Sequence, residues 1–401
     1  MNFSENEKAI YLFCAPLPQT KTKPLTTIEW NVTVKSLAKK NLAPAFLFEC
    51  TSNELIQLLH ETGEATESQK SKITEKVEAR QKLAFSLSEL EDLNHKGFGV
   101  LFRANYPKRL KKLKLKQRPP FYYFIGDISI LNSSRTLSVV GSRDATEDEL
   151  QTVAQITAEA ARNNVTIVSG GARGVDSIAV DTALEHGGKA IIFPTEGLAV
   201  WARKKEYRKY IQTNQLLLLS VQHVEAKFTA AYAMQRNKFI HSVGDATLVA
   251  SSQISKQKKS GTWEGVMENL KEKWSPIFVI GESEGVKKLI EMNAAKPFTS
   301  FNDAFLQNKE TVQRSLHKHF KHLILEASQL GLSKEEIKQA FHDAYHFAFQ
   351  QSLAKEKTTK YNLTEDDDYF TLNSLTLTQT DEEFDHERAP DTEAKQLKWD
   401  I

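Results

Sequence analysis

Short apolar runs alternate with longer amphipathic stretches from Thr136 to about residue 282. The runs are too short for buried helices and are rich in Val, Ile and Leu, which favours strands. Alternation at this spacing predicts a parallel sheet covered by helices on both faces, an α/β fold. The predicted strands are Leu137–Val140, Thr166–Ser169, Ala190–Phe193, Leu216–Ser220, Thr247–Ala250 and Ile277–Ile280, with helices at about 147–163, 174–186, 203–213, 228–241 and 262–272.

The regions on either side of this alternation have a helical pattern. Leu55, Leu58 and Leu59 share one helical face, and a stretch rich in Glu, Lys and Gln follows over 67–93. Near the other end, Ser333 and Glu336 have the spacing of a helix-capping pair. The chain therefore divides into a helical N-terminal domain (1–100), an α/β domain (101–296), a helical C-terminal module (297–355) and an acidic tail (356–401) that is expected to be disordered.

Charge is distributed unevenly over the 401 residues. Residues 365–400 carry twelve acids and three bases, a net charge of −9, so the rest of the chain carries +11 because the total is +2. A basic body with an acidic tail is a common arrangement among nucleic-acid binders, although a solvated surface with a solubilising tail has the same signature. No apolar run is long enough to span a membrane, the N-terminus lacks a signal-peptide pattern, and two cysteines suit a reducing cytoplasm.

A strongly basic segment precedes the α/β region. Residues 103–118 contain eight positive charges and no acid, and the pair Pro119-Pro120 ends any helix there. The segment could follow a nucleic-acid backbone, or it could be a solvated helix whose leucines, Leu110 and Leu113 among them, pack inward. Phe121–Ile125, directly after it, has the composition of a strand.

Glycine-containing loops follow the first two predicted strands. Gly141, Ser142 and Arg143 come after the first, and the segment Ser169–Asp176, which includes Gly170, Gly171 and Arg173, comes after the second and begins a helix. Ligands of doubly wound sheets bind beyond the carboxyl ends of the strands, where glycine exposes backbone N–H groups and a helix N-terminus attracts anions. The spacing matches neither a dinucleotide fingerprint nor a Walker A loop, so these loops predict anion binding without a nucleotide-motif assignment.

Two further groups flank the fifth predicted strand. Arg236, Asn237 and Lys238 precede it, and Ser260, Gly261 and Thr262 follow it at the start of a helix. Cationic side chains and glycine loops at one sheet edge suit a phosphate backbone. Trp263 and Phe239 are candidate base-stacking residues, with a core role as the alternative.

These motifs, in this order, resemble the DNA-processing protein A family (DprA, also called Smf) over residues about 100–282. The segments that carry the resemblance are Tyr106-Pro107, Pro119-Pro120, Gly126-Asp127, Gly141-Ser142-Arg143, Ser169–Asp176, Ala183-Leu184 with Gly187-Gly188, Arg236-Asn237 and Ser260-Gly261-Thr262. The resemblance implies a Rossmann-like core that binds single-stranded DNA as a homodimer and delivers it to a RecA-type recombinase. It implies no catalytic residue, no metal and no cofactor.

The resemblance also implies a binding pocket formed by Arg143, Ser169, Gly170, Arg236, Asn237, Lys238 and Ser260. This chain departs from the family pattern at several positions. Val180 stands where the family usually has His, Lys238 where it has Arg, and Ala250-Ser251-Ser252 where it has an acid. The family's frequent C-terminal winged helix is not evident in the sequence.

Two other functions remain open from the residues. The protein could be a regulatory subunit, such as an antitoxin or an anti-phage defence component, whose C-terminal module binds a cognate toxin or another partner protein. It could also resemble the nucleotide phosphoribohydrolases of the LOG type, whose loop places a Glu near the position of Glu264. His342 and His346 have metal-ligand spacing on a helix, but no acid or Cys partner is placed near them, and surface histidines explain them better.

Overall fold

A computed structural model describes residues 3–17, 20–83, 87–254, 260–301, 321, 323–327 and 330–343. The chain forms two compact units, of which the first contains Met1–Asn308 and the second Lys309–Leu397. The predicted acidic tail and His346 lie outside the described residues. The four-part domain division stays a prediction, and strand β1 (Gly99–Phe102) crosses its boundary at residue 100.

The N-terminal region is helical, as its sequence predicts. Four helices, α1 (Glu5–Cys14), α2 (Thr27–Lys39), α3 (Ser52–Thr62) and α4 (Glu67–Gln81), are followed by a shorter one, α5 (Ser88–His95). Each of the first four begins at a Ser or Thr whose hydroxyl accepts a hydrogen bond from the third helical residue, and that residue's Glu or Gln side chain accepts one in return. These reciprocal caps satisfy backbone donors that a helix start leaves unpaired, which fixes where each helix begins.

Within the described part of the chain, the sheet has nine strands in the order β1-β2-β6-β5-β4-β3-β7-β8-β9. All six predicted strands are present and pair in parallel: β3 (Arg135–Val140), β4 (Val165–Ser169), β5 (Ala190–Ile192), β6 (Leu216–Ser220), β7 (Ala246–Val249) and β8 (Ile277–Val279). The chain winds outward from β3 to β6 and then returns to place β7 on the other side of β3. This is the doubly wound arrangement that the sequence predicts.

The sheet also contains strands beyond the six predicted ones, two of which pair antiparallel. β2 (Phe121–Gly126) pairs antiparallel with β6, and β1 pairs antiparallel with β2. At the opposite edge, the short β9 (Lys296–Pro297) pairs in parallel with β8. Phe121–Ile125 is thus a strand as predicted, but the hydrophobic pattern did not identify its partner.

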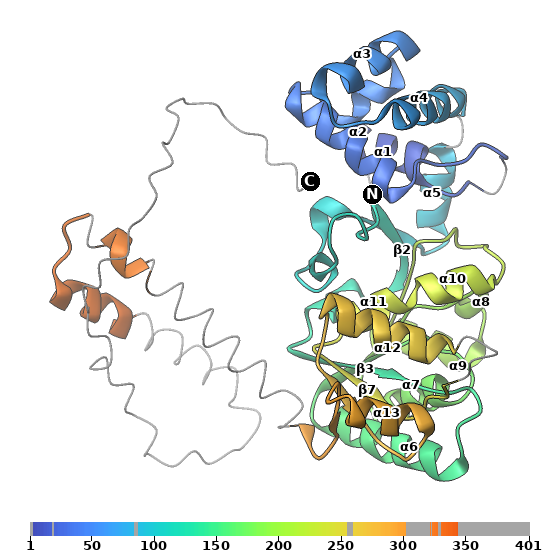
Figure 1. The fold of residues 1–401 in the computed structure, drawn as a ribbon, viewed down its shortest axis with the longest axis vertical. Coiled ribbons are helices and arrows are strands. Elements are labelled where there is room, and N and C mark those ends of the chain that lie inside the picture. Colours follow the sequence, from blue (N-terminus) through green and yellow to red (C-terminus); the bar gives the residue numbers. More distant parts are fainter. Residues whose placement is uncertain are drawn as a thin grey trace. The chain divides into compact units, whose positions relative to one another are not determined.

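Helices cover both faces of the sheet (Figure 1). Alternate strand residues point to opposite sides, so Leu137 and Val139 join one hydrophobic cluster and Val140 joins the other. The first cluster includes residues of α6 (Glu147–Arg162), α7 (Val175–Glu185), α8 (Leu198–Ala202) and α9 (Lys205–Gln212); the second includes residues of α11 (Asn237–Val243), α12 (Gly261–Glu272) and α13 (Glu284–Glu291). A further short helix of the α/β region, α10 (Ala230–Gln235), directly precedes α11.

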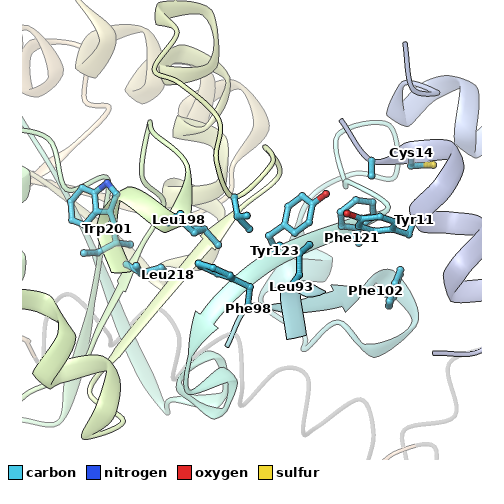
Figure 2. Packing of buried hydrophobic residues seen from close by; sticks show 14 of the residues in the cluster. Tyr11, Cys14, Leu93, Phe98, Phe102, Phe121, Tyr123, Leu198, Trp201 and Leu218 are labelled. Atoms are coloured by element: carbon cyan, nitrogen blue, oxygen red, sulfur yellow. The ribbon is translucent and has the colours of Figure 1, made fainter. Parts of the chain in front are cut away.

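The N-terminal helices and the sheet share a continuous apolar core. Tyr11 of α1 contacts Phe121 and Tyr123 of β2, with ring centroids 5.8 and 6.2 Å apart, and Figure 2 shows these rings side by side. Its hydroxyl donates a hydrogen bond to Glu89 of α5 (3.1 Å), which also accepts one from His223 of the α/β region (2.9 Å). The N-terminal helices therefore pack directly against the α/β region and share its hydrophobic core.

The basic segment 103–118 is neither a long helix nor a uniformly exposed surface. It forms two three-residue 3-10 turns, and Leu110 and Leu113 are buried as expected. Arg103 donates to the carbonyl oxygens of Pro119 and Arg118, and Arg109 forms an ion pair with Asp245 (2.6 Å). Much of this charge is therefore used to tie the loop to the core, because buried carbonyl groups and Asp245 need donors.

The described part of the second unit contains two short helical segments, at 323–327 and 334–343. Ser333 and Glu336 exchange hydrogen bonds at the start of the second segment, so the predicted cap is confirmed. Within the described ranges, no helix is both long and apolar enough to cross a membrane.

Candidate nucleic-acid interface

The predicted loops converge at one edge of the sheet, around the carboxyl end of β3. This strand lies between β4 and β7, where the winding direction reverses, and such reversal points are where doubly wound sheets bind ligands. The Thr262 hydroxyl at the start of α12 donates a hydrogen bond to the carbonyl oxygen of Gly141 (2.9 Å). The Asn237 amide donates to the carbonyl oxygen of Gly261 (2.9 Å). These bonds connect the loop after β3 with the starts of α12 and α11. We call these three segments, together with the β4–α7 loop, the glycine-loop site.

The loop between β4 and α7 passes very close to the loop after β3. Gly174 has φ of +88°, and a Cβ there would lie 2.6 Å from the carbonyl oxygen of Ser142. The Val175 N–H donates to that same oxygen (3.3 Å). Only glycine satisfies both the backbone angle and the contact, so the two loops form one surface at the N-terminus of α7.

A buried carboxylate, Asp176, lies in the first turn of α7, directly after the β4–α7 loop. It accepts hydrogen bonds from the backbone N–H groups of Ala172 and Gly170, and its side chain lies near Arg236. Burial raises its pKa, and the charge of Arg236 with the two N–H groups offsets this only in part. The Gly170 amide, predicted as a ligand donor, is thus engaged within the protein.

Arg236 lies on the other side of this loop and is almost fully buried, with 4 % of its surface exposed. Its guanidinium occupies the space beside Gly170, because a Cβ on that glycine would lie 1.5 Å from Nη1. Its nearest acid contact is loose, since Nη2 lies 3.9 Å from the Asp176 carboxylate. Nε and Nη1 have no hydrogen-bond partner among the described residues.

This shortage of acceptors is unusual, since buried arginines normally have their donors satisfied. Burial lowers the pKa of the Arg236 guanidinium, and Asp176 opposes that effect. Arginine remains charged in proteins, so the site holds a cation with more donors than acceptors. An anion at the loop would supply the missing acceptors.

Lys238 adds a second cation two residues along the chain. It is half-buried, its ammonium lies 5.2 Å from the Phe239 ring centroid, and burial lowers its pKa while Glu268 opposes the shift. Arg143 and Arg173 instead lie exposed on the loops, and Arg173 forms a surface ion pair with Asp144 (2.7 Å). The site therefore combines a buried cation with exposed ones at its rim.

Several predicted residues have structural tasks. The Ser169 hydroxyl is buried and donates to the carbonyl oxygen of Val139 (2.7 Å), so it is directed into the sheet. Ser260 caps α12 by accepting from the Trp263 N–H (3.4 Å). A Cβ on Gly171 would lie 2.3 Å from the Trp201 ring, so this glycine allows the indole to support the loop.

The predicted stacking residues are placed differently from each other. Phe239 is 3 % exposed and packs against Tyr122 and Phe193, which corresponds to the core alternative, whereas Trp263 is half-buried against the same cluster. Phe228, before α10, is 48 % exposed and was not predicted. Asp176 was also missed as an individual site residue; its place in the glycine motif was the available signal, but its pairing with Arg236 required the fold.

Comparison with protein families gives a match over this part of the chain. The model described as DNA recombination-mediator protein A matches residues 98–309. The DNA processing protein DprA of Streptococcus pneumoniae is 29% identical over 196 residues, covering 47% of this chain and 67% of the relative. The protein of the same name from Bacillus subtilis is 27% identical over 216 residues, covering 50% and 67%.

A solved structure shares the fold over a longer stretch. The X-ray structure of DprA from Streptococcus pneumoniae aligns with a TM-score of 0.57 and 20% identity. The alignment covers 77% of this chain and 98% of that chain.

Proposed function

Because the chain belongs to the DNA recombination-mediator protein A family, we propose that it is a non-catalytic recombination mediator that binds single-stranded DNA at the glycine-loop site. The family description names DNA recombination as the process. The geometry of the site supports a ligand that carries phosphate groups. Residues proposed to contact or position the DNA backbone are Gly141, Ser142, Arg143, Ser169, Gly170, Gly171, Arg173, Arg236, Asn237, Lys238, Ser260, Gly261 and Thr262.

The observation that carries this proposal is the environment of Arg236. A buried guanidinium with two unpartnered nitrogens, loosely paired to one carboxylate, favours a ligand that brings several oxygen acceptors. A phosphodiester does so and carries the required negative charge. Arg143 and Arg173 at the rim would neutralise neighbouring phosphates, which makes binding tolerant of sequence and sensitive to salt.

The site is proposed to hold DNA without breaking bonds in it. Glu264, which the hydrolase alternative requires, lies exposed in the first turn of α12. The described residues contain no group of three or more His, Cys, Asp or Glu that could hold a metal. The proposal extends to a homodimer that acts with a RecA-type recombinase in the cytoplasm.

Binding of labelled single- and double-stranded oligonucleotides, followed by fluorescence anisotropy over a salt titration, tests this function. The wild type should prefer the single strand. Arg236→Ala and Arg143→Ala should each weaken binding and reduce the slope of log affinity against log salt by ~0.7 for every phosphate that is no longer neutralised. Arg208→Ala, which removes an exposed arginine from α9, is the matched control and should change neither quantity.

Two results would contradict the proposal. Equal affinity for both strand forms would remove the single-strand assignment. Wild-type affinity and salt slope in both arginine variants would show that DNA, if bound, lies elsewhere.

A further inference from the structure

A groove with a volume of about 400 Å³ runs between α3 and α4 on the surface of the N-terminal region. Figure 1 shows these two helices side by side. None of the lining residues belongs to the glycine-loop site, so the groove is a separate surface. The side chains on which the argument rests are Ile56 of α3 and Glu67, Lys70, Thr74, Glu75 and Glu78 of α4.

The groove is acidic, because three exposed glutamates and a single lysine line it. Lys70 is 6 % exposed, and its ammonium group is already paired. It lies 2.6 Å from the Glu67 carboxylate and 3.0 Å from Nδ1 of His60. Lys70 therefore compensates the charge of Glu67, and the other end of the groove, at Glu75 and Glu78, keeps its negative charge.

The two carboxylates at this end have room for further donors. Glu75 forms no hydrogen bond or ion pair within the described part of the chain. Glu78 accepts a hydrogen bond from the Ser52 hydroxyl (2.9 Å) and pairs with the exposed Lys82 (3.4 Å). An ionised carboxylate offers about four lone-pair sites, so acceptor capacity remains on both. Because they are three positions apart on α4, the two carboxylates are neighbours on the helix surface.

A buried hydroxyl without a partner lies beside these carboxylates. Thr74 lines the groove and is 6 % exposed, and its Oγ1 has no hydrogen-bond partner among the described residues. Threonines inside helices commonly donate to the carbonyl oxygen four residues earlier, as Thr33 and Thr62 do in α2 and α3. Thr74 does not. A buried hydroxyl without a partner is unfavourable, so a donor that enters the groove would stabilise it.

The opposite wall adds an apolar contact, because the Ile56 side chain is 43 % exposed. The groove thus combines two carboxylates, a hydroxyl acceptor and an aliphatic surface. Carboxylates repel phosphate groups, which disfavours a nucleic acid as the occupant. A basic protein segment supplies all the complementary groups, since an arginine presents several N–H donors in a planar fork.

We propose that this groove binds a basic segment of a partner protein. An arginine of that segment donates to Glu75, Glu78 and Thr74, and an aliphatic side chain next to it packs on Ile56. The proposal goes beyond the DNA-binding function and does not depend on it. The chain would hold DNA at the glycine-loop site and a protein partner on its N-terminal helices.

Labelled peptides test the groove on the full-length protein. The probes are hexapeptides with two arginines and one leucine among alanines, in which the spacing between the arginines is varied. The control peptides carry citrulline in place of both arginines, which keeps the shape and removes the charge. Fluorescence anisotropy should show binding of an arginine peptide and no binding of its citrulline counterpart. Raising the salt concentration should weaken this binding, because salt screens exposed charges.

Two charge variants locate the peptide on the protein. Glu75→Gln and Glu78→Gln should each weaken peptide binding by about 3-fold, as expected for the loss of a partly exposed ion pair. Glu159→Gln, which removes an exposed glutamate from α6, is the matched control and should bind the peptide like the wild type.

Thr74→Val separates a binding role from a structural one. Valine has nearly the shape of threonine and lacks the hydroxyl. Because that hydroxyl has no partner in the fold, the urea midpoint of unfolding should stay the same or rise, while peptide binding should weaken by about 5-fold. A lower midpoint would show that the hydroxyl is used within the fold and would remove it from the proposed site.

Three results would overturn the docking groove. The first is that no arginine peptide binds. The second is that Glu75→Gln and Glu78→Gln bind the peptide like the wild type. The third is that spermine binds as tightly as the peptides and displaces them, which would assign the groove to small polycations. Each of these leaves the proposed DNA function intact, because that function is tested with variants of the glycine-loop site.

Discussion

Replacing Gly170 with alanine probes whether the buried Arg236 guanidinium is the centre of the site. The added Cβ would lie 1.5 Å from Nη1, 2.1 Å from Cζ and 2.2 Å from Nη2 of Arg236. Ordinary contacts between such atoms need about 3.5 Å, so the guanidinium must move by about 2 Å or leave its position. Gly170 does not have a left-handed backbone, so alanine itself is tolerated there and the effect falls on Arg236.

Displacing Arg236 has two consequences of different kinds. Asp176 is deprived of the cation that partly offsets its burial, which should lower the free energy of unfolding by about 2 kcal/mol. Single-stranded DNA no longer meets the cation proposed to bind its central phosphate, which should weaken binding about 10-fold and reduce the salt slope by ~0.7.

A double-mutant cycle with Arg236→Ala measures the interaction directly. In the Arg236→Ala background the guanidinium is absent, so the methyl group of Gly170→Ala has nothing to clash with. Its further effect on the free energy of unfolding should therefore lie within about 0.5 kcal/mol of zero. Chemical denaturation measures the free energy of unfolding of all four proteins in the cycle, and fluorescence anisotropy over a salt titration measures their DNA affinities. The two single variants should resemble the double variant in affinity.

Additive effects in the cycle would refute this reasoning. Wild-type binding and salt slope in Gly170→Ala would also refute it, because the structure leaves no room for the methyl group beside Arg236. Reduced stability with unchanged binding would assign Arg236 a structural role only.

Three further expectations follow from the same group of side chains and from the Glu89–His223 pair. Asp176→Asn removes a negative charge beside Arg236 and should tighten single-strand binding about 5-fold, ~1 kcal/mol, in the anisotropy assay; unchanged or weaker binding would show that the carboxylate does not compete with phosphate. The same variant should lessen the decrease in stability with rising pH: burial raises the pKa of Asp176, so its neutral form favours the folded state at low pH and its ionisation opposes folding as pH rises. His223→Ala removes the hydrogen-bond donor that keeps the pKa of Glu89 low despite burial. Denaturation at pH 7 should therefore show a free energy of unfolding that is lower by about 1–3 kcal/mol. Below pH 4.5 the variant should lose less further stability than the wild type, in which this contribution disappears as Glu89 becomes protonated.

The sequence was sufficient to predict the parallel core. Each of its six strands is a short run of apolar residues, and each is bounded by polar or turn-forming positions. Burial on both faces requires such runs, so the local pattern carries the information directly. The antiparallel pairing of β2 with β6 carries no comparable signal, because it joins residues nearly a hundred positions apart in the chain.

The sequence also indicated where the site would lie, since loops after parallel strands meet at one sheet edge. It did not indicate how each side chain would be used. The hydroxyl of Ser169 was expected to contact a ligand, yet it donates a hydrogen bond to the neighbouring strand β3. The charges of 103–118 left both a DNA-facing surface and a solvated helix open, yet Arg103 and Arg109 satisfy buried acceptors of the protein itself.

The sequence by itself therefore determined which segments form helices or strands and in what order. It also showed which glycines and cationic residues lie at the ends of these segments. The contacts between distant segments were decided only by the tertiary structure. Arg236 meets Gly170 and Asp176 across sixty or more positions of the chain. The hydrophobic periodicity of a segment indicates which of its faces is buried. Only the packing of the folded chain determines which distant residues contact that face.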